Sequence, residues 1–429
     1  MIWSFLLGMV TATVLSGAVL GAALGLTGFA ILHFFAGGST RIGVQTVWNT
    51  LNVFTLTAIP LFILLGELLV ASGLARGVYR ALAPIFGRLP GGLLHTNIAV
   101  CTVFGAVSGS SMSVAAAVGS VAYPELKSRG YDRAQTVGTL AAGGTLGLLI
   151  PPSLSLLIYG ALTDTSIGRL FMAGVLPGLM MAAIFMGWIL FAALRNPAIA
   201  PAEKRVALGA ALRGLTAALP LLVLIVCVLG SLFAGIATPT EAAGVGVAAA
   251  AILGFTIGDV TLRGVGQALS GTVRTFAVIA MVFVGALVLA QAISLLGLPQ
   301  QMLEVVSAWG LSKWLLLLVV VVIYLILGCF FDGLSMMIMT LPLVFPLLTG
   351  VGFDPVWLGV VVTIMIEVGM LTPPVGMNLF VLVGITGGEV NLGAAAKAAL
   401  PYWAALLLGV VILCFFPGIA TWLPSLAFG

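Results

Sequence analysis

Long apolar runs separated by short polar loops cover most of the chain. A membrane-spanning helix needs about 20 consecutive apolar residues. Runs of this kind lie at about 2–23, 25–37, 52–72, 135–162, 168–194, 214–235, 241–257, 273–296, 355–385 and 398–424, of which the second is short. The pattern predicts an all-α polytopic membrane protein.

Two further apolar stretches are too long for one simple span and are interrupted near their middle by small polar residues. Residues 93–122 break at Ser108-Gly109-Ser110-Ser111, and residues 315–349 break at Phe331-Asp332-Gly333-Leu334-Ser335. Irregular backbone at membrane depth survives only inside protein or beside a water-filled cavity. We therefore predict two re-entrant helical hairpins with polar tips.

The two halves of the chain share landmarks at a nearly constant offset of about 224 residues. The matched landmarks are Ser72-Gly73-Leu74 with Leu296-Gly297-Leu298, Ser108-Gly109-Ser110 with Asp332-Gly333-Leu334, Pro151-Pro152 with Pro373-Pro374, Pro177 with Pro401, and Glu67 with Gln291. We infer a first repeat over 1–195, a linker over 196–212 and a second repeat over 213–429. Each repeat then holds one hairpin (93–122 and 315–349) and one broken helix (135–162 and 355–385).

Composition agrees with a membrane location and indicates an orientation. Hydrophobic residues make up 62% of the chain and charged residues 7%, against about 25% charged in soluble domains. This excludes a nucleic-acid-binding protein, a disordered tail and a disulfide scaffold. Basic residues are retained in cytoplasmic loops, and 13 of the 16 lie in the loops 73–93, 123–133, 195–213, 258–274 and 388–397.

With those loops cytoplasmic, the linker is cytoplasmic, both termini are periplasmic, and the two hairpins enter from opposite faces. The repeats are therefore inverted. Inverted repeats with interrupted helices are the architecture of secondary transporters, whose sites lie near the middle of the membrane. The N-terminal run has no basic residue before Arg41, so we interpret it as a retained first helix and not as a signal peptide.

Four interruptions are expected to converge: the two hairpin tips and the two Pro-Pro breaks. Proline removes a backbone donor and clashes with the carbonyl four residues earlier, so a Pro-Pro pair frees carbonyl oxygens. These oxygens, with Ser, Thr and Asn oxygens, suit Na⁺, and helix N-termini suit a carboxylate. The alternative is that the prolines serve only as kinks and packing residues.

The acids near the interruptions have more than one interpretation. A carboxylate inside the membrane is expensive and usually functional. Asp332 could be a cation ligand, a proton carrier or a cap for the following helix. Glu367 could couple transport to an ion or be a paired structural acid, and Glu67 is expected to be structural.

Several other features have simpler interpretations. Thr238-Pro239-Thr240-Glu241 predicts a capping box, and residues 74–88 and 298–312 predict interfacial amphipathic helices. The four cysteines are expected to be small buried hydrophobes. No metal site is expected from the two histidines, which lie far apart in sequence.

Several motifs, taken together and in order, resemble the large membrane subunit (C4-dicarboxylate type) of the tripartite ATP-independent periplasmic (TRAP) transporters. The resemblance covers nearly the whole chain. The matching segments are 58–68 (AIPLFILLGEL), 87–92 (GRLPGG), 108–110 (SGS), 127–131 (KSRGY), 150–153 (IPPS), 174–178 (GVLPG), 238–242 (TPTEA), Asp332 with its flanks, and 371–380 (LTPPVGMNLF). One departure is the first tip, which reads Ser-Gly-Ser-Ser-Met-Ser where many relatives continue with Ala and an acidic residue.

The resemblance implies a Na⁺-coupled importer of organic acids with an elevator-type fold. It implies a periplasmic substrate-binding protein and a small four-helix membrane subunit as partners, a bacterial inner-membrane location, and no enzymatic activity or cofactor besides Na⁺. One Na⁺ would bind near Ser108, Gly109, Ser110, Thr145 and Pro151. A second would bind near Asp332, Gly333, Ser335, Gly369, Thr372 and Pro373. The substrate carboxylate would lie between the tips, near Ser111, Pro152, Ser153, Pro374 and Asn378.

Rival functions remain at this point. A stand-alone ion-coupled carboxylate carrier of related inverted-repeat design would need no binding protein. A membrane-embedded enzyme would need a convergent acid–base or metal set, and the sequence shows no His, Asp and Glu cluster with ligand spacing. A passive channel is a further possibility, but two opposed hairpins favour alternating access.

Overall fold

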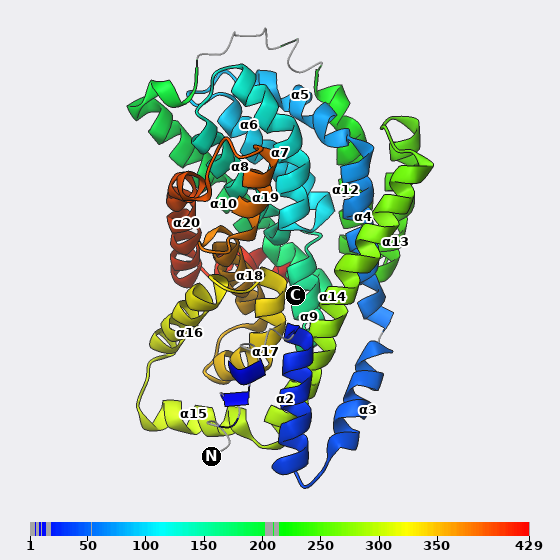
Figure 1. Ribbon diagram of the computed structural model, residues 1–429, viewed down its shortest axis with the longest axis vertical. Coiled ribbons are helices and arrows are strands. Elements are labelled where there is room, and N and C mark those ends of the chain that lie inside the picture. Colours follow the sequence, from blue (N-terminus) through cyan, green and yellow to red (C-terminus); the bar gives the residue numbers. More distant parts are fainter. Residues whose placement is uncertain are drawn as a thin grey trace.

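The chain forms a bundle of helices, which Figure 1 shows with its long axis vertical. The computed structural model describes residues 5, 8–9, 11–13, 19–52, 54–201, 209 and 214–428, and all regular elements in this part are helical. The α-helices of the first half are α2 (Leu20–Phe34), α3 (Thr40–Leu51), α4 (Ala58–Ser72), α5 (Leu74–Phe86), α6 (Leu93–Ser108), α7 (Ser111–Ser128), α8 (Arg133–Leu149), α9 (Leu154–Thr163) and α10 (Ile167–Arg195).

The α-helices of the second half are α12 (Leu219–Phe233), α13 (Pro239–Thr256), α14 (Leu262–Leu295), α15 (Leu298–Ala308), α16 (Lys313–Gly328), α17 (Gly333–Gly350), α18 (Pro355–Leu371), α19 (Met377–Ile385), α20 (Leu392–Phe415) and α21 (Gly418–Phe428). Short 3₁₀ helices cover Phe54–Thr57, Pro197–Ile199 and Leu215–Ala218.

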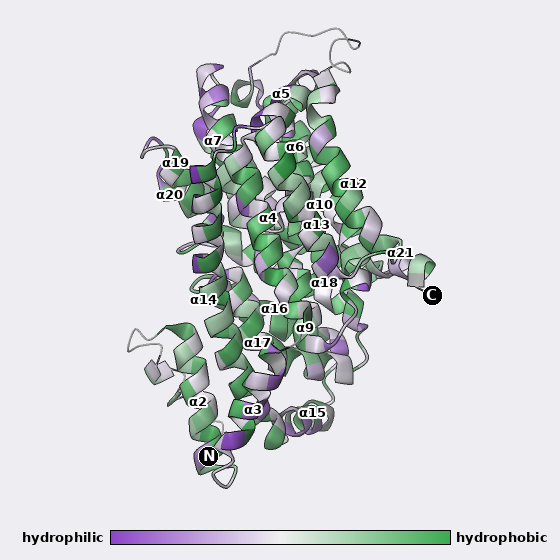
Figure 2. Ribbon diagram, turned by 90° about the vertical axis from the view of Figure 1, so that its right-hand side faces the viewer, coloured by the Kyte–Doolittle hydropathy of each residue, from purple (hydrophilic) through white to green (hydrophobic). Residues whose placement is uncertain are grey.

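The apolar character predicted from the sequence extends to the outer surface of the bundle (Figure 2). Large apolar side chains such as Val226 of α12 and Val273 of α14 are 69% and 68% exposed. Seven described helices are long and apolar enough to cross a membrane, or eight if α4 and α5, which meet at a 69° bend, form one span. The chain is therefore a multi-pass membrane protein.

Each predicted hairpin corresponds to a pair of helices joined by a short turn, and the re-entry of these pairs into a membrane stays a prediction. The first hairpin consists of α6 and α7, and the second consists of α16 and α17. Figure 1 shows α5, α6 and α7 toward one end of the bundle and α15, α16 and α17 toward the other. The order of elements from α4 to α10 recurs from α14 to α20, whereas the inversion of the repeats across a membrane stays a prediction.

Both predicted broken helices also form. The first is α8, an extended connection over 150–153, and α9; the second is α18, a connection over 372–376, and α19. The peptide bonds Pro151–Pro152 and Pro373–Pro374 are both cis. We call residues 108–111 the first tip, 331–335 the second tip, 150–153 the first break and 372–376 the second break.

Several span boundaries differ from the prediction. The run 25–37 is a helix over Leu20–Phe34, and 398–424 is two helices, because Phe416 and Pro417 interrupt it. The run 273–296 is the end of a longer helix that begins at Leu262, and the helix Thr40–Leu51 was not predicted. Half of the predicted first span, 2–23, lies outside the described residues.

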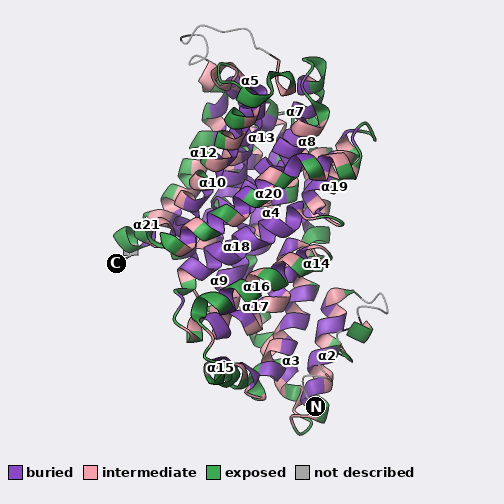
Figure 3. Cartoon of the chain, turned by 90° about the vertical axis from the view of Figure 1, so that its left-hand side faces the viewer, coloured by how far each residue is buried: buried purple, intermediate pink, exposed green. Residues whose placement is uncertain are grey.

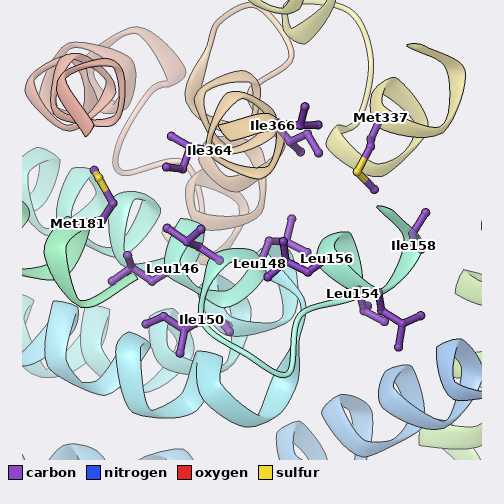
Figure 4. Packing of buried hydrophobic residues seen from close by; sticks show 14 of the residues in the cluster. Leu146, Leu148, Ile150, Leu154, Leu156, Ile158, Met181, Met337, Ile364 and Ile366 are labelled. Atoms are coloured by element: carbon purple, nitrogen blue, oxygen red, sulfur yellow. The ribbon is translucent and has the colours of Figure 1, made fainter. Parts of the chain in front are cut away.

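The core of the bundle is built around the broken helices (Figure 3). Residues 136–149 of α8 and 357–371 of α18 are buried on every side, as expected of a helix with no polar face. Figure 4 shows Ile364 and Ile366 of α18 near Leu148 and Leu156 of the first broken helix, with Met337 of α17 beside them. The two halves of the chain therefore share one core.

Helix ends follow the predicted local signals. Thr238 accepts a hydrogen bond from the Glu241 backbone N–H, and the Glu241 carboxylate accepts one from the Thr238 N–H, which completes the capping box. The predicted amphipathic helices over 74–88 and 298–312 correspond to α5 and α15. Helix α5 buries Leu74, Val78 and Leu82 on one face.

Candidate functional site

The first tip is a tight turn between α6 and α7. Gly109 adopts φ 63°, a left-handed conformation that glycine tolerates. Ser110 then begins α7 as its N-cap, since its Oγ accepts a hydrogen bond of 3.4 Å from the Ser113 N–H. The Gly109 carbonyl accepts a hydrogen bond of 3.2 Å from the Leu154 N–H. The first tip is thus in direct contact with the start of α9, immediately after the first break, whereas the convergence of all four interruptions stays a prediction.

The first break uses hydroxyl groups to satisfy its backbone. Ser153 caps α9, because its Oγ accepts a hydrogen bond from the Leu156 N–H at 3.2 Å. The Leu148 carbonyl, which Pro152 prevents from bonding within the helix, accepts hydrogen bonds from the hydroxyls of Ser153 and Ser155. The Thr145 hydroxyl donates to the Ala142 carbonyl at 2.6 Å. The Leu148 carbonyl, which the Pro-Pro pair was expected to leave free, therefore already accepts hydrogen bonds.

A buried polar cluster joins the first tip to the second broken helix. It consists of Ser111 at the start of α7, Glu367 in α18 and Asn378 in α19, each at most 1% exposed. The Ser111 hydroxyl donates to Glu367 Oε2 at 3.2 Å and accepts from Asn378 Nδ2 at 2.7 Å. Asn378 Nδ2 also reaches the Ala141 carbonyl of α8 at 3.3 Å. Residues more than 230 positions apart in sequence meet here.

The second tip is capped by its own carboxylate. Asp332 Oδ2 accepts a hydrogen bond of 3.0 Å from the Ser335 N–H, so Asp332 is the N-cap of α17. Asp332 is partly exposed, whereas Gly333 and Ser335 are buried. Gly333 packs against Ile366 of α18. The capping interpretation of Asp332 is therefore correct, and a role in Na⁺ binding stays a prediction.

The second break is more open than the first. Pro373 and Pro374 are exposed, and Gly376 begins α19 with φ 36°. The Thr372 hydroxyl donates to the Val368 carbonyl at 2.7 Å and accepts from Trp403 Nε1 at 3.0 Å. Trp403 on α20 thus fixes the Thr372 side chain.

A cavity lies beside the first tip. Its volume is about 270 Å³, and it is bounded by α4, α14, α7, α9 and α19. Its lining includes Ile63, Glu67, Ser108, Ser110, Met112, Ser113, Ala116, Leu154, Thr275 and Val381. Ser108 Oγ is buried and makes no hydrogen bond to the described residues. A polar group with an unused donor and acceptor therefore faces a space large enough for a small organic molecule.

These features match a known family of membrane proteins. The family model of the DctM component of tripartite ATP-independent periplasmic transporters matches residues 7–419. The chain belongs to this family. The TRAP permease reading of the sequence motifs is thereby confirmed.

This TRAP permease aligns with its relatives over nearly the full length of both chains. The C4-dicarboxylate TRAP transporter large permease protein DctM of Pseudomonas aeruginosa is 35% identical, with 94% of each chain covered. The sialic acid TRAP transporter large permease protein SiaM of Vibrio cholerae is 30% identical, with 96% of each covered. The 2,3-diketo-L-gulonate TRAP transporter large permease protein YiaN of Escherichia coli is also 30% identical over 96% of each. These relatives are permease subunits and not enzymes.

Solved transporter structures share the fold of the permease. The YdaH transporter of Alcanivorax borkumensis superposes with a TM-score of 0.59 at 18% identity, covering 90% of this chain and 88% of its own. The MtrF efflux pump of Neisseria gonorrhoeae has a TM-score of 0.64 at 12% identity, covering 91% and 85%. At these identities the likeness concerns the fold alone.

The permease thus brings together some of the predicted site residues and leaves others apart. Gly109 contacts Leu154 directly after the first break, and Ser111 contacts Asn378 and Glu367. Asp332 and Thr372, both predicted for the second site, bond to different groups: Asp332 to the Ser335 N–H, and Thr372 to Val368 and Trp403. Sequence reasoning missed Trp403, as well as the contact of Ser155 with Thr363 of α18 at 3.2 Å. A second serine two residues after Ser153 was the only signal for the latter.

No metal centre of the transition-metal type is found in the described part of the permease, where no three His, Cys, Asp or Glu residues gather. His95 hydrogen-bonds to the Pro90 carbonyl at 2.8 Å at the start of α6. Of the four cysteines, Cys101 is buried, Cys329 and Cys414 are partly buried, and Cys227 is exposed. The expected burial is therefore confirmed for Cys101, is met only in part by Cys329 and Cys414, and is wrong for Cys227, which lies on the apolar helix α12.

Proposed function

We propose that this permease is the transport subunit of a Na⁺-coupled importer of organic acids. The observation that carries the proposal is the meeting of the first tip with both broken helices. Ser111 contacts Asn378, and Gly109 contacts Leu154. Interrupted helices that converge inside a membrane protein are the usual setting of ion and substrate sites in secondary transporters.

The first Na⁺ site would use the first tip and the first break. Ser108 supplies a buried hydroxyl oxygen without a hydrogen bond, and the Gly109–Ser110 backbone lies beside it. Thr145 and Pro151 would complete the surroundings from the broken helix. The second site would use Asp332, Gly333 and Ser335 with Gly369, Thr372 and Pro373.

The substrate would be a small carboxylate bound next to the first tip. The cavity of about 270 Å³ is of suitable size. Ser110, the N-cap of α7, lines it, so the helix N-terminus that favours an anion borders the cavity. The residues predicted from the sequence to surround the carboxylate between the tips lie outside the lining of this cavity: Ser111, Pro152, Ser153, Pro374 and Asn378. Relatives named for C4-dicarboxylate, sialic acid and diketogulonate support this class, since all are carboxylates.

Transport would follow an elevator mechanism in a bacterial inner membrane, with both termini in the periplasm. The part bearing the tips would move against α4 and α14, and Na⁺ would favour the loaded form through its higher affinity for that form. A periplasmic substrate-binding protein would deliver the acid, and a small four-helix membrane subunit would extend the fixed part.

Uptake into proteoliposomes tests the proposal. Labelled dicarboxylates and sugar acids are offered under an inward Na⁺ gradient, with and without the binding protein and the small subunit. The expected result is uptake only with all components and only with Na⁺. Uptake by this chain alone would favour the stand-alone carrier, and uptake indifferent to Na⁺ would contradict ion coupling.

A further inference from the structure

Among the described residues, Glu67 is the one charged side chain that lines the cavity beside the first tip. It lies in α4, is partly exposed, and forms no hydrogen bond or ion pair with any other described residue. A carboxyl group inside a membrane-spanning helix is costly, and such groups usually face a partner or a water-filled cavity for a functional reason. The described part of the chain supplies no partner, so the partner of Glu67 is to be sought in the cavity.

The carboxylate of Glu67 is directed toward α14, which runs beside α4 (Figure 1). A Cβ on Gly271 would lie 3.2 Å from Glu67 Oε2, so the carboxylate lies close to α14 at a position that has no side chain. Thr275 follows Gly271 by four residues and therefore lies on the same face of α14, one turn further along. It also lines the cavity. Glu67 and Thr275 thus form one polar wall of the cavity.

A second polar wall belongs to the first tip. Ser108, Ser110 and Ser113 line the cavity from the end of α6 and the first turn of α7. Ser108 is 1% exposed, and its hydroxyl has no hydrogen-bond partner among the described residues. The N–H groups of the first turn of a helix have no acceptor within the helix. Hydroxyl and N–H groups of this kind suit a carboxylate.

The two walls offer a ligand different chemistry. The first tip offers hydrogen-bond donors, whereas the Glu67 carboxylate only accepts hydrogen bonds. A ligand with a second carboxylate would place a like charge against Glu67, which is strongly unfavourable. A hydroxyl or ammonium group at that end would instead donate a hydrogen bond to Glu67. The rest of the lining is mostly apolar, as Ile63, Met112 and Leu154 show, and suits a hydrocarbon chain.

We propose that Glu67 determines the substrate class: the cavity takes a monocarboxylate that carries a hydroxyl or ammonium group at its other end, and it discriminates against a dicarboxylate of the same length. The carboxylate binds at the first tip, and the donor group binds at the wall formed by Glu67 and Thr275. This selectivity rests on the proposed transport function and narrows its substrate class. It is separate from Na⁺ binding, since none of the ion ligands proposed above lies on α4 or α14.

Three probes with the same four-carbon chain test this selectivity: succinate, γ-hydroxybutyrate and γ-aminobutyrate. Each has one carboxylate, and they differ only at the other end, which is a carboxylate, a hydroxyl or an ammonium group. Isothermal titration calorimetry of the purified permease in Na⁺ gives the Kd of each probe. We expect both donor-bearing probes to bind the wild type at least about tenfold more tightly than succinate. Equal or tighter binding of succinate, or binding of none of the probes, would overturn the proposal.

Glu67→Gln is the decisive variant, because the amide keeps the size of the side chain and adds N–H donors that suit a carboxylate. It should strengthen succinate binding and weaken γ-aminobutyrate binding, so that the preference disappears. Glu304→Gln, at an exposed position of α15, should keep the preference. An unchanged preference in Glu67→Gln would contradict the role of Glu67. An equal loss of affinity for all three probes with an altered Na⁺ dependence would also contradict it, since an ion ligand would give that result.

A second variant keeps the test decisive if Glu67→Gln cannot be isolated. Thr275→Val replaces the hydroxyl by a methyl group, so it should weaken the binding of γ-hydroxybutyrate more than that of succinate; equal weakening would contradict the proposed wall. Uptake into proteoliposomes separates this selectivity from the proposed function. Donor-dependent binding without Na⁺-driven uptake would contradict only the proposed function. Na⁺-driven uptake in which succinate competes as well as the donor-bearing probes would contradict only the selectivity.

Discussion

Gly328 and Gly369 bring the backbones of α16 and α18 into contact: a Cβ on Gly328 would lie 2.6 Å from the Cα of Gly369. The first half has a similar crossing, since a Cβ on Gly105 of α6 would lie 2.9 Å from the Cα of Gly147 of α8. In each half a hairpin therefore packs on its broken helix through two glycines. Close approach of this kind is typical of helix packing in membranes, where small residues form the interface.

The first prediction concerns this glycine crossing. Gly328→Ala is expected to lower the stability of the permease by about 1–3 kcal/mol, because the added methyl group has no space without backbone shifts. Thermal unfolding in detergent measures the change as a lower melting temperature. Gly384→Ala in α19 is the matched control, since a Cβ there meets nothing within 4 Å. Equal melting temperatures for the two variants would contradict the crossing.

The sequence predicted the interruptions well because their cause is local. Polar tips and Pro-Pro pairs stand out in apolar runs, and both hairpins and both breaks were found from them. Boundaries were missed where the signal is mixed. The helix Thr40–Leu51 carries Arg41, Gln45 and Asn49 and so does not form an apolar run. The break at Pro417 had a proline signal, but its apolar surroundings concealed it.

Tertiary contacts of the site could not be predicted, because no local pattern encodes them. Ser111 and Glu367 are 256 residues apart, and their contact depends on how α7 and α18 pack. Likewise, the hydrogen bond from Trp403 to Thr372 joins α20 to the second break without any motif. The repeat predicted contact between the two halves of the chain, but which side chains make that contact depends on how the helices pack.

The second prediction tests the Na⁺ ligands. Ser108→Ala removes the unpaired buried oxygen at the first tip, so the Na⁺ concentration for half-maximal uptake is expected to rise by about tenfold, the equivalent of about 1.4 kcal/mol. Asp332→Asn should weaken Na⁺ activation at the second tip in the same way. Ser120→Ala in α7 is the control, because that hydroxyl bonds only within its helix. Unchanged Na⁺ activation in both tip variants would remove these site assignments.

The third prediction concerns the ion pairs that hold the loop after α19. Glu389 accepts hydrogen bonds from Lys127 and from Tyr123, the latter at 3.0 Å, and Arg133 lies 3.5 Å away. The Lys127 contact, with that of Tyr123, lowers the pKa of Glu389 below its ordinary value of 4.5. The ionised group therefore stabilises the fold at neutral pH, and this contribution is lost as the pH falls below about 4.5 through the native pKa.

Glu389→Gln should accordingly reduce the melting temperature at pH 7, and the difference from the wild type should shrink as the pH is lowered below 4.5. Melting curves of both proteins across this range provide the measurement. Glu304→Gln, at an exposed position of α15, is the control and should match the wild type at each pH. A Glu389→Gln deficit that is the same at all pH values would contradict the role of the charge.

The last prediction concerns the contact between α4 and the first tip, at which the two parts would slide past one another in the proposed elevator mechanism. A Cβ on Gly66 would lie 2.8 Å from the Ser108 carbonyl oxygen and 3.2 Å from its hydroxyl. Gly66→Ala should therefore disfavour the arrangement seen here and slow uptake by about tenfold or more, because a strain of a few kcal/mol shifts the balance between two conformations by that factor. Gly25→Ala, whose Cβ would make an ordinary 3.5 Å contact with Gly285, should transport normally. If α4 and the tip instead moved together, Gly66→Ala would lower only the melting temperature, and the uptake rate per folded molecule would equal that of the wild type.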